Sequence, residues 1–228
     1  MKCLILAGGF GRRVQPAIGD KPKALLEYLG KPLISHIIDR IPPDIDIFIS
    51  TNKRFEDGLL RWRETVQRSI KILVEPSQSE DQKPGALSSI SYWVQNKNIS
   101  DDLLVIASDN YFEFDLGQFL ASYNGKNALV AAYDMGDKEK ARNFGVIRLN
   151  GCKIVEFNEK PPQPGSSLVA TACYIFPQRV LKICSIYCME GKKDLLGDFI
   201  AHLVDTDEVF GFPFREKWFD IGNEIEMG

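Results

Sequence analysis

The chain has 228 residues, of which 44% are hydrophobic and 26% charged, a composition typical of a soluble globular protein. Its net charge of −3 gives no electrostatic reason for broad DNA or RNA binding. No apolar run approaches the roughly 20 residues of a membrane helix. The apolar start breaks at Gly8 and Gly9, too early for a signal-peptide core. We therefore expect a cytoplasmic protein with neither nucleic-acid nor membrane partners.

The five cysteines are scattered and odd in number, which predicts reduced thiols. Cys184 and Cys188 lie one helical turn apart and could hold a metal ion. The only two histidines, His36 and His202, are not close to them in the sequence. We interpret the pair as small apolar core residues.

Short apolar runs alternate with segments of helical spacing along the first 132 residues. Unbroken runs of this kind are typical of strands buried on both faces. The expected strands are residues 3–6, 46–50, 71–75, 103–107 and 128–132. Helical spacing follows at residues 32–38 and 84–94, each with a proline near its start. The alternation predicts a single-domain α/β fold over residues 1–228, Rossmann-like, with a mostly parallel sheet and helices on both faces.

After residue 134 the pattern changes. Residues 146–149 and 152–157 predict an antiparallel hairpin, with Asn150 and Gly151 as the two positive-φ residues of a type I′ turn. A further strand is expected at residues 169–176, and helices at about 178–189 and 195–204.

The loop after the first strand is rich in glycine and positive charge. It reads Leu6-Ala7-Gly8-Gly9-Phe10-Gly11-Arg12-Arg13, and Lys21-Pro22-Lys23 follows. The glycines allow backbone N–H groups to approach a polyphosphate, although a tight strand exit would use the same residues. Val14 breaks the dinucleotide-binding pattern, the second expected strand ends at Ser50 rather than at an acidic residue, and the Gly-Lys-Ser/Thr of a P-loop is absent.

These residues resemble the opening of the sugar-phosphate nucleotidyltransferase family, L-A-G-G-x-G-x-R, then a proline, then P-K and K-P. This chain has Pro16, Pro22-Lys23 and Lys31-Pro32-Leu33-Ile34 in the same order. Later segments are similar to the family's G-D-N, F-G-V, F-x-E-K-P and W-x-D-x-G-T motifs. They are Ser108-Asp109-Asn110, Gly145-Val146-Ile147, Phe157-Asn158-Glu159-Lys160-Pro161 and Trp218-Phe219-Asp220-Ile221-Gly222-Asn223.

The resemblance implies an enzyme that transfers a nucleoside monophosphate from an NTP to a sugar 1-phosphate and releases pyrophosphate with Mg²⁺. It implies an NTP-binding half (residues 1–110) and an acceptor-binding half (111–228). The implied catalytic residues are Arg13 and Lys23, and the implied Mg²⁺ ligands are Asp109 and Asp220. The implied NTP contacts are Leu6, Ala7, Gly8, Gly9, Gly11, Arg13, Gly85 and Asp109. The implied sugar-phosphate contacts are Gly145, Glu159, Lys160 and Thr171.

The chain departs from the family pattern at several positions. Arg12 stands where threonine is common, and Asn223 replaces a usual threonine. Thymidine-type relatives have glutamine where this chain has Glu75, and only Gly85-Ala86-Leu87 remains of a base-reading segment. A glutamate could accept from the amino group of guanine or cytosine, which leaves the base open. Because the chain ends soon after Asp220, we expect neither an acetyltransferase activity nor an allosteric site built from a tail.

Two other functions fit part of the pattern. Part of the sequence also resembles cytidylyltransferases that act on phosphocholine or another phosphorylated alcohol, namely Pro22-Lys23-Ala24-Leu25 and Asp109-Asn110-Tyr111. Such an enzyme would need an aromatic cage to bind a quaternary ammonium group. An inactive regulatory module that binds nucleotide without turnover is the alternative of another class. Release of pyrophosphate would separate this module from an enzyme.

Overall fold

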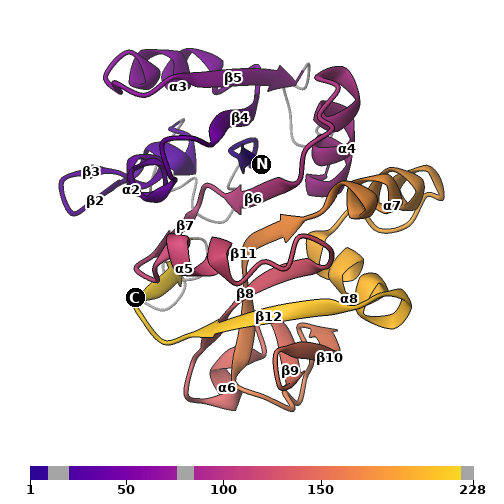
Figure 1. Ribbon diagram of the computed structural model, residues 1–228. Coiled ribbons are helices and arrows are strands. Elements are labelled where there is room, and N and C mark those ends of the chain that lie inside the picture. Colours follow the sequence, from indigo (N-terminus) through magenta and orange to yellow (C-terminus); the bar gives the residue numbers. More distant parts are fainter. Residues whose placement is uncertain (10–20, 76–84, 222–228) are drawn as a thin grey trace.

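The computed structural model describes residues 1–9, 21–75 and 85–221, in which one large sheet runs through the molecule (Figure 1). In these residues the sheet has nine strands in the order β5-β4-β1-β6-β11-β8-β12-β10-β9. Their bounds are β1 (Lys2–Leu6), β4 (Asp46–Asn52), β5 (Ile70–Glu75), β6 (Leu103–Ala107), β8 (Ala128–Asp134), β9 (Gly145–Asn150), β10 (Lys153–Glu159), β11 (Leu168–Phe176) and β12 (Val209–Phe214).

Most of these strands point in one direction. The neighbours β5, β4, β1 and β6 are mutually parallel, and β8 is parallel to β12. Strand β11 runs antiparallel to β6 and β8, and β10 runs antiparallel to β9 and β12. Only β11 and β10 of the nine therefore point the opposite way. The predicted α/β class with a mostly parallel sheet is confirmed, and antiparallel pairing extends beyond the predicted hairpin to β11.

Helices cover both faces of the sheet because successive strand residues point to opposite sides. In β1, Cys3 and Ile5 pack on the side of α2 (Leu33–Arg40), α3 (Glu56–Arg63) and α5 (Leu116–Ala121). Leu4, between them, packs on the side of α4 (Ala86–Asn96), α7 (Gln178–Met189) and α8 (Leu196–Thr206). A short α6 (Lys138–Ala141) and a 3₁₀ turn, η1 (Lys23–Leu25), complete the described helices. None of them combines the length and apolar character needed to cross a bilayer.

The five cysteines are free thiols. Cys184 is fully buried in the core formed by α4, α7 and α8, and burial raises the pKa of its thiol. Cys188 is half-buried one turn later. The described residues contain no group of three or more His, Cys, Asp or Glu side chains that could hold a metal ion.

Several elements were not predicted. They include α3, α5, β12 and two small two-stranded sheets, β2–β3 (Glu27–Tyr28 with Lys31–Pro32) and β7–β13 (Asn110–Phe112 with Trp218–Asp220). Strand β12 contains Gly211 and Pro213, which normally interrupt a strand. It pairs with β8 from Val209 to Phe214 but with β10 only at Phe210. Pro213 thus lies where the strand has no described partner on the β10 side, and its missing N–H costs no pairing there.

The hairpin between β9 and β10 is confirmed, but its turn lies one residue later than predicted. Asn150 pairs with Lys153, so the two central residues are Gly151 and Cys152. Gly151 has a φ of 59°, and neither Asn150 nor Cys152 is among the described non-glycine residues with positive φ. Positive φ at the first central position alone is what a type II′ turn requires, so the predicted type I′ turn is wrong. Asn150 is the last paired residue of its strand instead of a turn residue.

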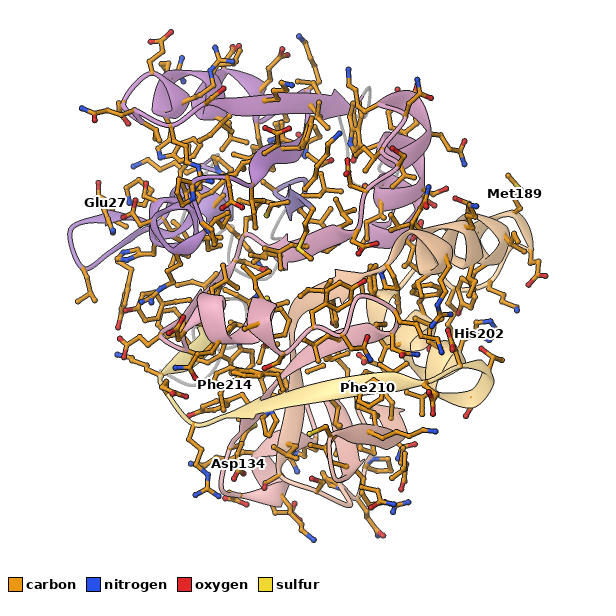
Figure 2. All side chains as sticks on the ribbon, in the orientation of Figure 1. Glu27, Asp134, Met189, His202, Phe210 and Phe214 are labelled. Carbon is orange, nitrogen blue, oxygen red and sulfur yellow. The ribbon has the colours of Figure 1, made fainter. Side chains whose placement is uncertain are left out.

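Replacing a fully buried ring in the core should strongly destabilise the protein. Phe199 is 0% exposed and contacts the rings of Phe176 and Tyr187. We expect Phe199→Ala to lower the free energy of unfolding by about 3–5 kcal/mol in urea titrations, because it leaves a cavity. Met189, 78% exposed at the end of α7 (Figure 2), is the control, and Met189→Ala should change that free energy by less than about 0.5 kcal/mol. Equal losses in the two variants would contradict this core.

Candidate active site

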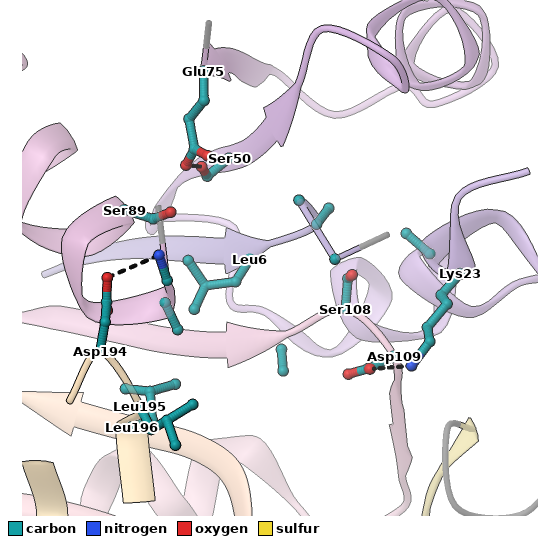
Figure 3. Close-up of a pocket in the computed structure, with 17 residues that line it drawn as sticks. Leu6, Lys23, Ser50, Glu75, Ser89, Ser108, Asp109, Asp194, Leu195 and Leu196 are labelled. Atoms are coloured by element: carbon teal, nitrogen blue, oxygen red, sulfur yellow. Dashed lines mark hydrogen bonds and ion pairs between the residues drawn. The ribbon is translucent and has the colours of Figure 1, made fainter. Parts of the chain in front are cut away.

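A cavity of about 350 Å³ lies where β1, β4, β5 and β6 end (Figure 3). These strands are parallel, so their carboxyl ends meet at one edge of the sheet, which is where open α/β sheets bind ligands. The residues with predicted roles that line the cavity are Leu6, Ala7, Gly8, Gly9, Lys23, Gly85 and Asp109. Gly11 and Arg13 lie outside the described residues.

The turn after β1 that contains Gly8 and Gly9, called the glycine turn below, is hydrogen-bonded to the end of β4. The Ala7 N–H donates to the Ser50 carbonyl at 2.7 Å, and the Ala7 carbonyl accepts from Thr51 Oγ1 at 3.3 Å. Asn52 Nδ2 donates to the Gly8 carbonyl at 2.9 Å. A Cβ on Gly8 would come no closer than 3.8 Å to a described atom, so internal packing does not require glycine there. The bare backbone suits the close approach of a ligand from the cavity.

Lys23 and Asp109 form an ion pair on the cavity wall. Lys23, the first residue of η1, places Nζ 3.1 Å from Asp109 Oδ2, and both side chains are largely buried. The other oxygen, Oδ1, accepts from Asn110 Nδ2 at 3.1 Å. The Asn110 amide is itself held by Trp218 Nε1, which donates to Asn110 Oδ1 at 2.8 Å. A buried chain of hydrogen bonds therefore fixes the orientation of the Asp109 carboxylate.

Asp220 is brought close to the backbone of Asp109 by the pairing of β13 with β7, although it is not among the described residues that line the cavity. It lies directly opposite Asn110 in this antiparallel pair. The next residue, Ile221, donates its N–H to the Asp109 carbonyl at 3.0 Å. The two aspartates are thus one residue apart in adjoining segments. Mg²⁺ is commonly held by one or two carboxylates together with substrate phosphates, and this pair of hard oxygen ligands fits that pattern.

Glu159 occupies a tight space between the start of β9 and the first turn of α8. A Cβ on Gly145 would lie 2.4 Å from Phe157 Cζ and 3.1 Å from Glu159 Oε2, and a Cβ on Gly197 would lie 2.2 Å from Glu159 Oε2. Both glycines therefore make room for this carboxylate and its neighbour. Burial raises the pKa of Glu159, nearby Asp198 adds to the rise, and Lys160 opposes it.

Lys160 and Thr171 are held by the backbone around them. Lys160 has a φ of 47°, donates its N–H to the Phe144 carbonyl at 3.0 Å, and has Nζ 3.8 Å from Glu159 Oε1. Thr171 is buried, and its Oγ1 donates to the Ala131 carbonyl at 3.0 Å. The next residue, Ala172, has a φ of 53° within an irregular stretch of β11. Because the Thr171 hydroxyl is engaged within the sheet, the backbone of this residue would make the contact with the sugar phosphate. The role of Thr171 stays a prediction.

Asp194, which was not predicted as a site residue, joins the two halves of the chain. Its carboxylate accepts from the N–H groups of Gly85, Leu87 and Ser88 at 2.8, 2.9 and 3.0 Å and so caps α4 from the loop before α8. A Cβ on Gly85 would lie 2.3 Å from Asp194 Cγ, so glycine is required at this contact. The partners are 109 residues apart, and no local pattern could have linked them.

Two more carboxylates are not among the predicted site residues, although the sequence named Glu75 as a possible acceptor from guanine or cytosine. Glu75, at the end of β5, is 3% exposed, lines the cavity and accepts from Ser50 Oγ at 2.7 Å. Asp198, in the first turn of α8, has an oxygen, Oδ2, that is buried with no hydrogen-bond partner in the described part of the chain. Buried carboxylate oxygens of this kind favour a ligand that brings hydrogen-bond donors.

The family model for nucleotidyl transferases matches residues 2–225, and the chain belongs to this family. A putative mannose-1-phosphate guanyltransferase of Sulfolobus acidocaldarius is 30% identical over 97% of this chain and 60% of its own length. A bifunctional GlmU protein of Methanocaldococcus jannaschii is 28% identical over 100% of this chain and 52% of its own length. The chain thus spans little more than half of the length of these relatives.

Solved structures agree on the fold. A crystal structure of a putative glucose-1-phosphate thymidylyltransferase from Bacillus anthracis superposes with a TM-score of 0.84 at 25% identity, covering 100% of this chain and 92% of that one. A UDP-glucose pyrophosphorylase in complex with UDP-glucose superposes with a TM-score of 0.80 at 20% identity, covering 97% and 93%. The latter likeness concerns the fold alone.

Removing the Asp194 cap should affect both stability and the cavity. We expect Asp194→Ala to lower the free energy of unfolding by about 0.5–2 kcal/mol in urea and to raise the KM for NTP, because α4 begins at the cavity wall. Asp115 is the matched control, since it caps α5 by accepting from Gly117 and Gln118 and does not line the cavity. Asp115→Ala should cost similar stability with the KM unchanged. An unchanged KM in Asp194→Ala would contradict the link between cap and site.

The raised pKa of Glu159 predicts a pH-dependent difference between the wild type and Glu159→Gln. Because burial favours the protonated carboxyl in the folded state, its stabilising contribution is present below the unfolded-state pKa, near the ordinary value of 4.5, and is lost as the pH rises through the higher folded-state pKa. The free energy of unfolding of Glu159→Gln relative to wild type should therefore rise as the pH increases above about 4.5. If the difference in the free energy of unfolding between Glu159→Gln and wild type stays constant or falls with pH in urea titrations, the pKa of Glu159 is not raised.

Proposed function

We propose that the chain transfers a nucleoside monophosphate from an NTP to a sugar 1-phosphate and releases pyrophosphate, with Mg²⁺ as cofactor. The observation that carries the proposal is the Lys23–Asp109 ion pair at 3.1 Å on the wall of the cavity that also holds the glycine turn. Two relatives support this reaction type, the putative mannose-1-phosphate guanyltransferase and a UTP–glucose-1-phosphate uridylyltransferase of Haloferax volcanii.

The chemistry requires little covalent help from the protein. A phosphate oxygen of the acceptor attacks the α-phosphorus of the NTP, the bond from that phosphorus to the bridging oxygen of the β-phosphate breaks, and pyrophosphate leaves with the electron pair. Catalysis of this kind rests on positioning the reactants and on stabilising negative charge.

The described residues divide these tasks on the NTP side. Gly8 and Gly9 let the backbone approach the phosphates, and Lys23 supplies a buried positive charge for the α-phosphate as its pairing with Asp109 is exchanged. Asp109 and Asp220 would hold the cation, which neutralises phosphate charge when it is bound. Arg13 lies outside the described residues, and we propose that it binds the β- and γ-phosphates.

The acceptor side is built from the second half of the chain. Glu159 would accept from sugar hydroxyls, with Gly145 leaving the room that the Phe157 ring and the Glu159 carboxylate occupy. The backbone at Thr171 would add a further contact. Lys160 would hold the acceptor phosphate. Residues 1–110 then form the NTP-binding half and residues 111–228 the acceptor-binding half, and a cytoplasmic location belongs to the same proposal.

No observation favours the phosphocholine alternative. Within the described residues the lining of the cavity includes no aromatic side chain, and a cage for a quaternary ammonium needs several. The aromatic cluster of Tyr28, Tyr111 and Phe219 lies outside the described lining, and Lys217 Nζ is already 5.3 Å from the centre of the Tyr28 ring.

Pyrophosphate release tests the proposal. The purified chain is incubated with each common NTP and with glucose 1-phosphate, mannose 1-phosphate or phosphocholine, with and without Mg²⁺. We expect release that depends on a sugar 1-phosphate and on Mg²⁺. NTP binding without release under all conditions would instead support the regulatory module.

Loss of either member of the ion pair should slow the reaction severely. We expect Lys23→Ala and Asp109→Ala to lower kcat at least about a hundredfold, the scale for losing one preorganised electrostatic group. Lys153, which is exposed and pairs with Glu208 at 3.0 Å, provides the control, and Lys153→Ala should retain wild-type turnover. Near-normal turnover of folded Lys23→Ala or Asp109→Ala would rule out the roles assigned to them.

A further inference from the structure

A second cavity, of about 470 Å³, lies beside η1 and is called the outer cavity below. The chain around η1 contributes to the walls of both cavities. Lys23 and Ala24 line the active-site cavity, whereas Lys21, Pro22 and Leu25 line the outer cavity. The two linings have no described residue in common. The chain around η1 therefore separates two spaces, each large enough for a small ligand.

The opposite wall of the outer cavity is the start of α3, with Arg54, Gly58 and Arg61 among its residues. A Cβ on Gly58 would lie 3.5 Å from Leu25 Cδ1 and 3.9 Å from Pro22 Cδ. The first turn of α3 thus lies directly against the chain around η1, and the outer cavity lies between the same two elements.

The described lining of the outer cavity carries a net positive charge. It contains the cations Lys21, Arg54 and Arg61 and a single acid, Asp57. Lys21 and Arg61 are exposed, and neither forms an ion pair with a carboxylate in the described part of the chain. Cations that line one cavity repel each other, and an anion bound between them removes this repulsion. Arginine suits a phosphate through two parallel hydrogen bonds and lysine as a point charge, so the cavity fits a phosphate group.

The remainder of the outer cavity is apolar. Besides the charged residues, the described lining consists of Pro22, Leu25, Pro32, Phe55, Gly58 and Trp62. The polar atom of Trp62 is already used, because Nε1 donates to Ser35 Oγ at 3.0 Å. The cavity thus joins a cationic part to an apolar part. This combination suits a phosphate ester, in which a charged group is attached to a carbon skeleton, better than a bare inorganic ion.

Both walls of the outer cavity are connected to the active site. On the first wall, Lys21 is two residues before Lys23, the cation proposed to meet the α-phosphate. On the second wall, the Phe55 N–H donates to Asn52 Oδ1 at 3.2 Å, and Asn52 Nδ2 donates to the Gly8 carbonyl at 2.9 Å. A ligand that holds the two walls together therefore limits the movement of both η1 and the glycine turn.

We propose that the outer cavity is a regulatory site for a phosphate ester that the reaction does not consume, and that its occupation lowers the KM for NTP. The ester holds η1 and α3 in the arrangement that the NTP site requires, so that less ordering is left for NTP binding itself. The effect on the KM rests on the proposed function, whereas binding of the ester does not.

Equilibrium binding tests the site without the reaction. The probes are glucose 6-phosphate and AMP, which carry a phosphate ester but neither the 1-phosphate nor the triphosphate that the reaction uses. We expect isothermal titration calorimetry to show binding of at least one of them to the wild type. Preference for glucose 6-phosphate would assign the site to sugar phosphates, and preference for AMP would assign it to nucleotides. Inorganic phosphate should bind more weakly, because it cannot contact the apolar lining.

Substitutions on α3 locate the binding. We expect Arg61→Glu to weaken binding of the ester at least about tenfold, the scale for losing a hydrogen bond to a charged group. Arg61→Lys keeps the positive charge and should lose less. Arg63→Glu makes the same charge change two residues later, outside the described lining of the outer cavity, and should bind as the wild type does.

Pyrophosphate release tests the regulation. We expect a saturating concentration of the ester to lower the KM for NTP of the wild type and of Arg63→Glu by about fivefold or more, the lower end of ordinary allosteric coupling. Arg61→Glu should not respond. Without the ester, Arg61→Glu should keep the wild-type kcat, because Arg61 is not among the described residues that line the active-site cavity.

Each outcome decides the matter. If neither ester binds, or if wild type and folded Arg61→Glu bind it equally, the outer cavity is not a phosphate site. Equal binding of inorganic phosphate and the better ester overturns the ester class, and binding that leaves the KM unchanged overturns the regulatory role. If no NTP supports pyrophosphate release, the proposed function fails, and calorimetry still decides the site. Should Arg61→Glu not fold, Lys21→Glu on the opposite wall takes its place in both measurements.

Discussion

The site depends on one constraint, that the carboxyl ends of neighbouring parallel strands meet at the same edge of a sheet. The strands β1, β4 and β6 are buried on both faces, and β5 is partly exposed at the edge of the sheet, so polar groups in them reach the cavity where the strands end. Each of these ends supplies one group to the cavity, namely Gly8, Ser50, Glu75 and Asp109. The parallel register thus brings together a bare turn, a buried acid with its hydroxyl partner and the Asp109 carboxylate, the proposed ligand of the cation.

The rest of the chain returns to this edge twice. The pairing of β13 with β7 brings Asp220 next to Asp109, and the loop before α8 places Asp194 on the first N–H groups of α4. Neither contact could form without the completed sheet, because each joins the first half of the chain to the last. The same segment carries Asp198 towards Glu159, so that α8 borders the proposed acceptor side while the loop before it borders the proposed NTP side.

The periodicity of apolar residues was sufficient to predict the elements whose burial follows a regular pattern along the chain. The bounds of β6 and α7 match the prediction, because an unbroken apolar run and a full amphipathic helix are visible in the chain itself. Strand β12 was missed since Gly211 and Pro213 interrupt its pattern, and α3 was missed because only Leu59 and Trp62 of its residues are buried. In both cases tertiary packing, which the sequence does not display, overrides local preference.

The residues of the site also divide into those that the sequence could predict and those that it could not. Family motifs led to Lys23, Gly85 and Asp109, which the structure places on one cavity, while their partners were not predicted. The relay from Trp93 through Ser50 to Glu75 and the capping of Gly85 by Asp194 join residues with no shared pattern in the sequence. Contacts of this kind follow from the order of the strands, so they could be found only once the sheet was built.

The central claim is that a triphosphate lies on the glycine turn with a divalent cation between Asp109 and Asp220. A crystal structure with a non-hydrolysable NTP analogue and Mn²⁺, recorded at a wavelength where manganese scatters anomalously, tests it most directly. The account predicts an anomalous peak in contact with both carboxylates and with a phosphate oxygen, and Lys23 turned from Asp109 to the α-phosphate. A peak elsewhere, or a triphosphate bound away from Gly8, would contradict it.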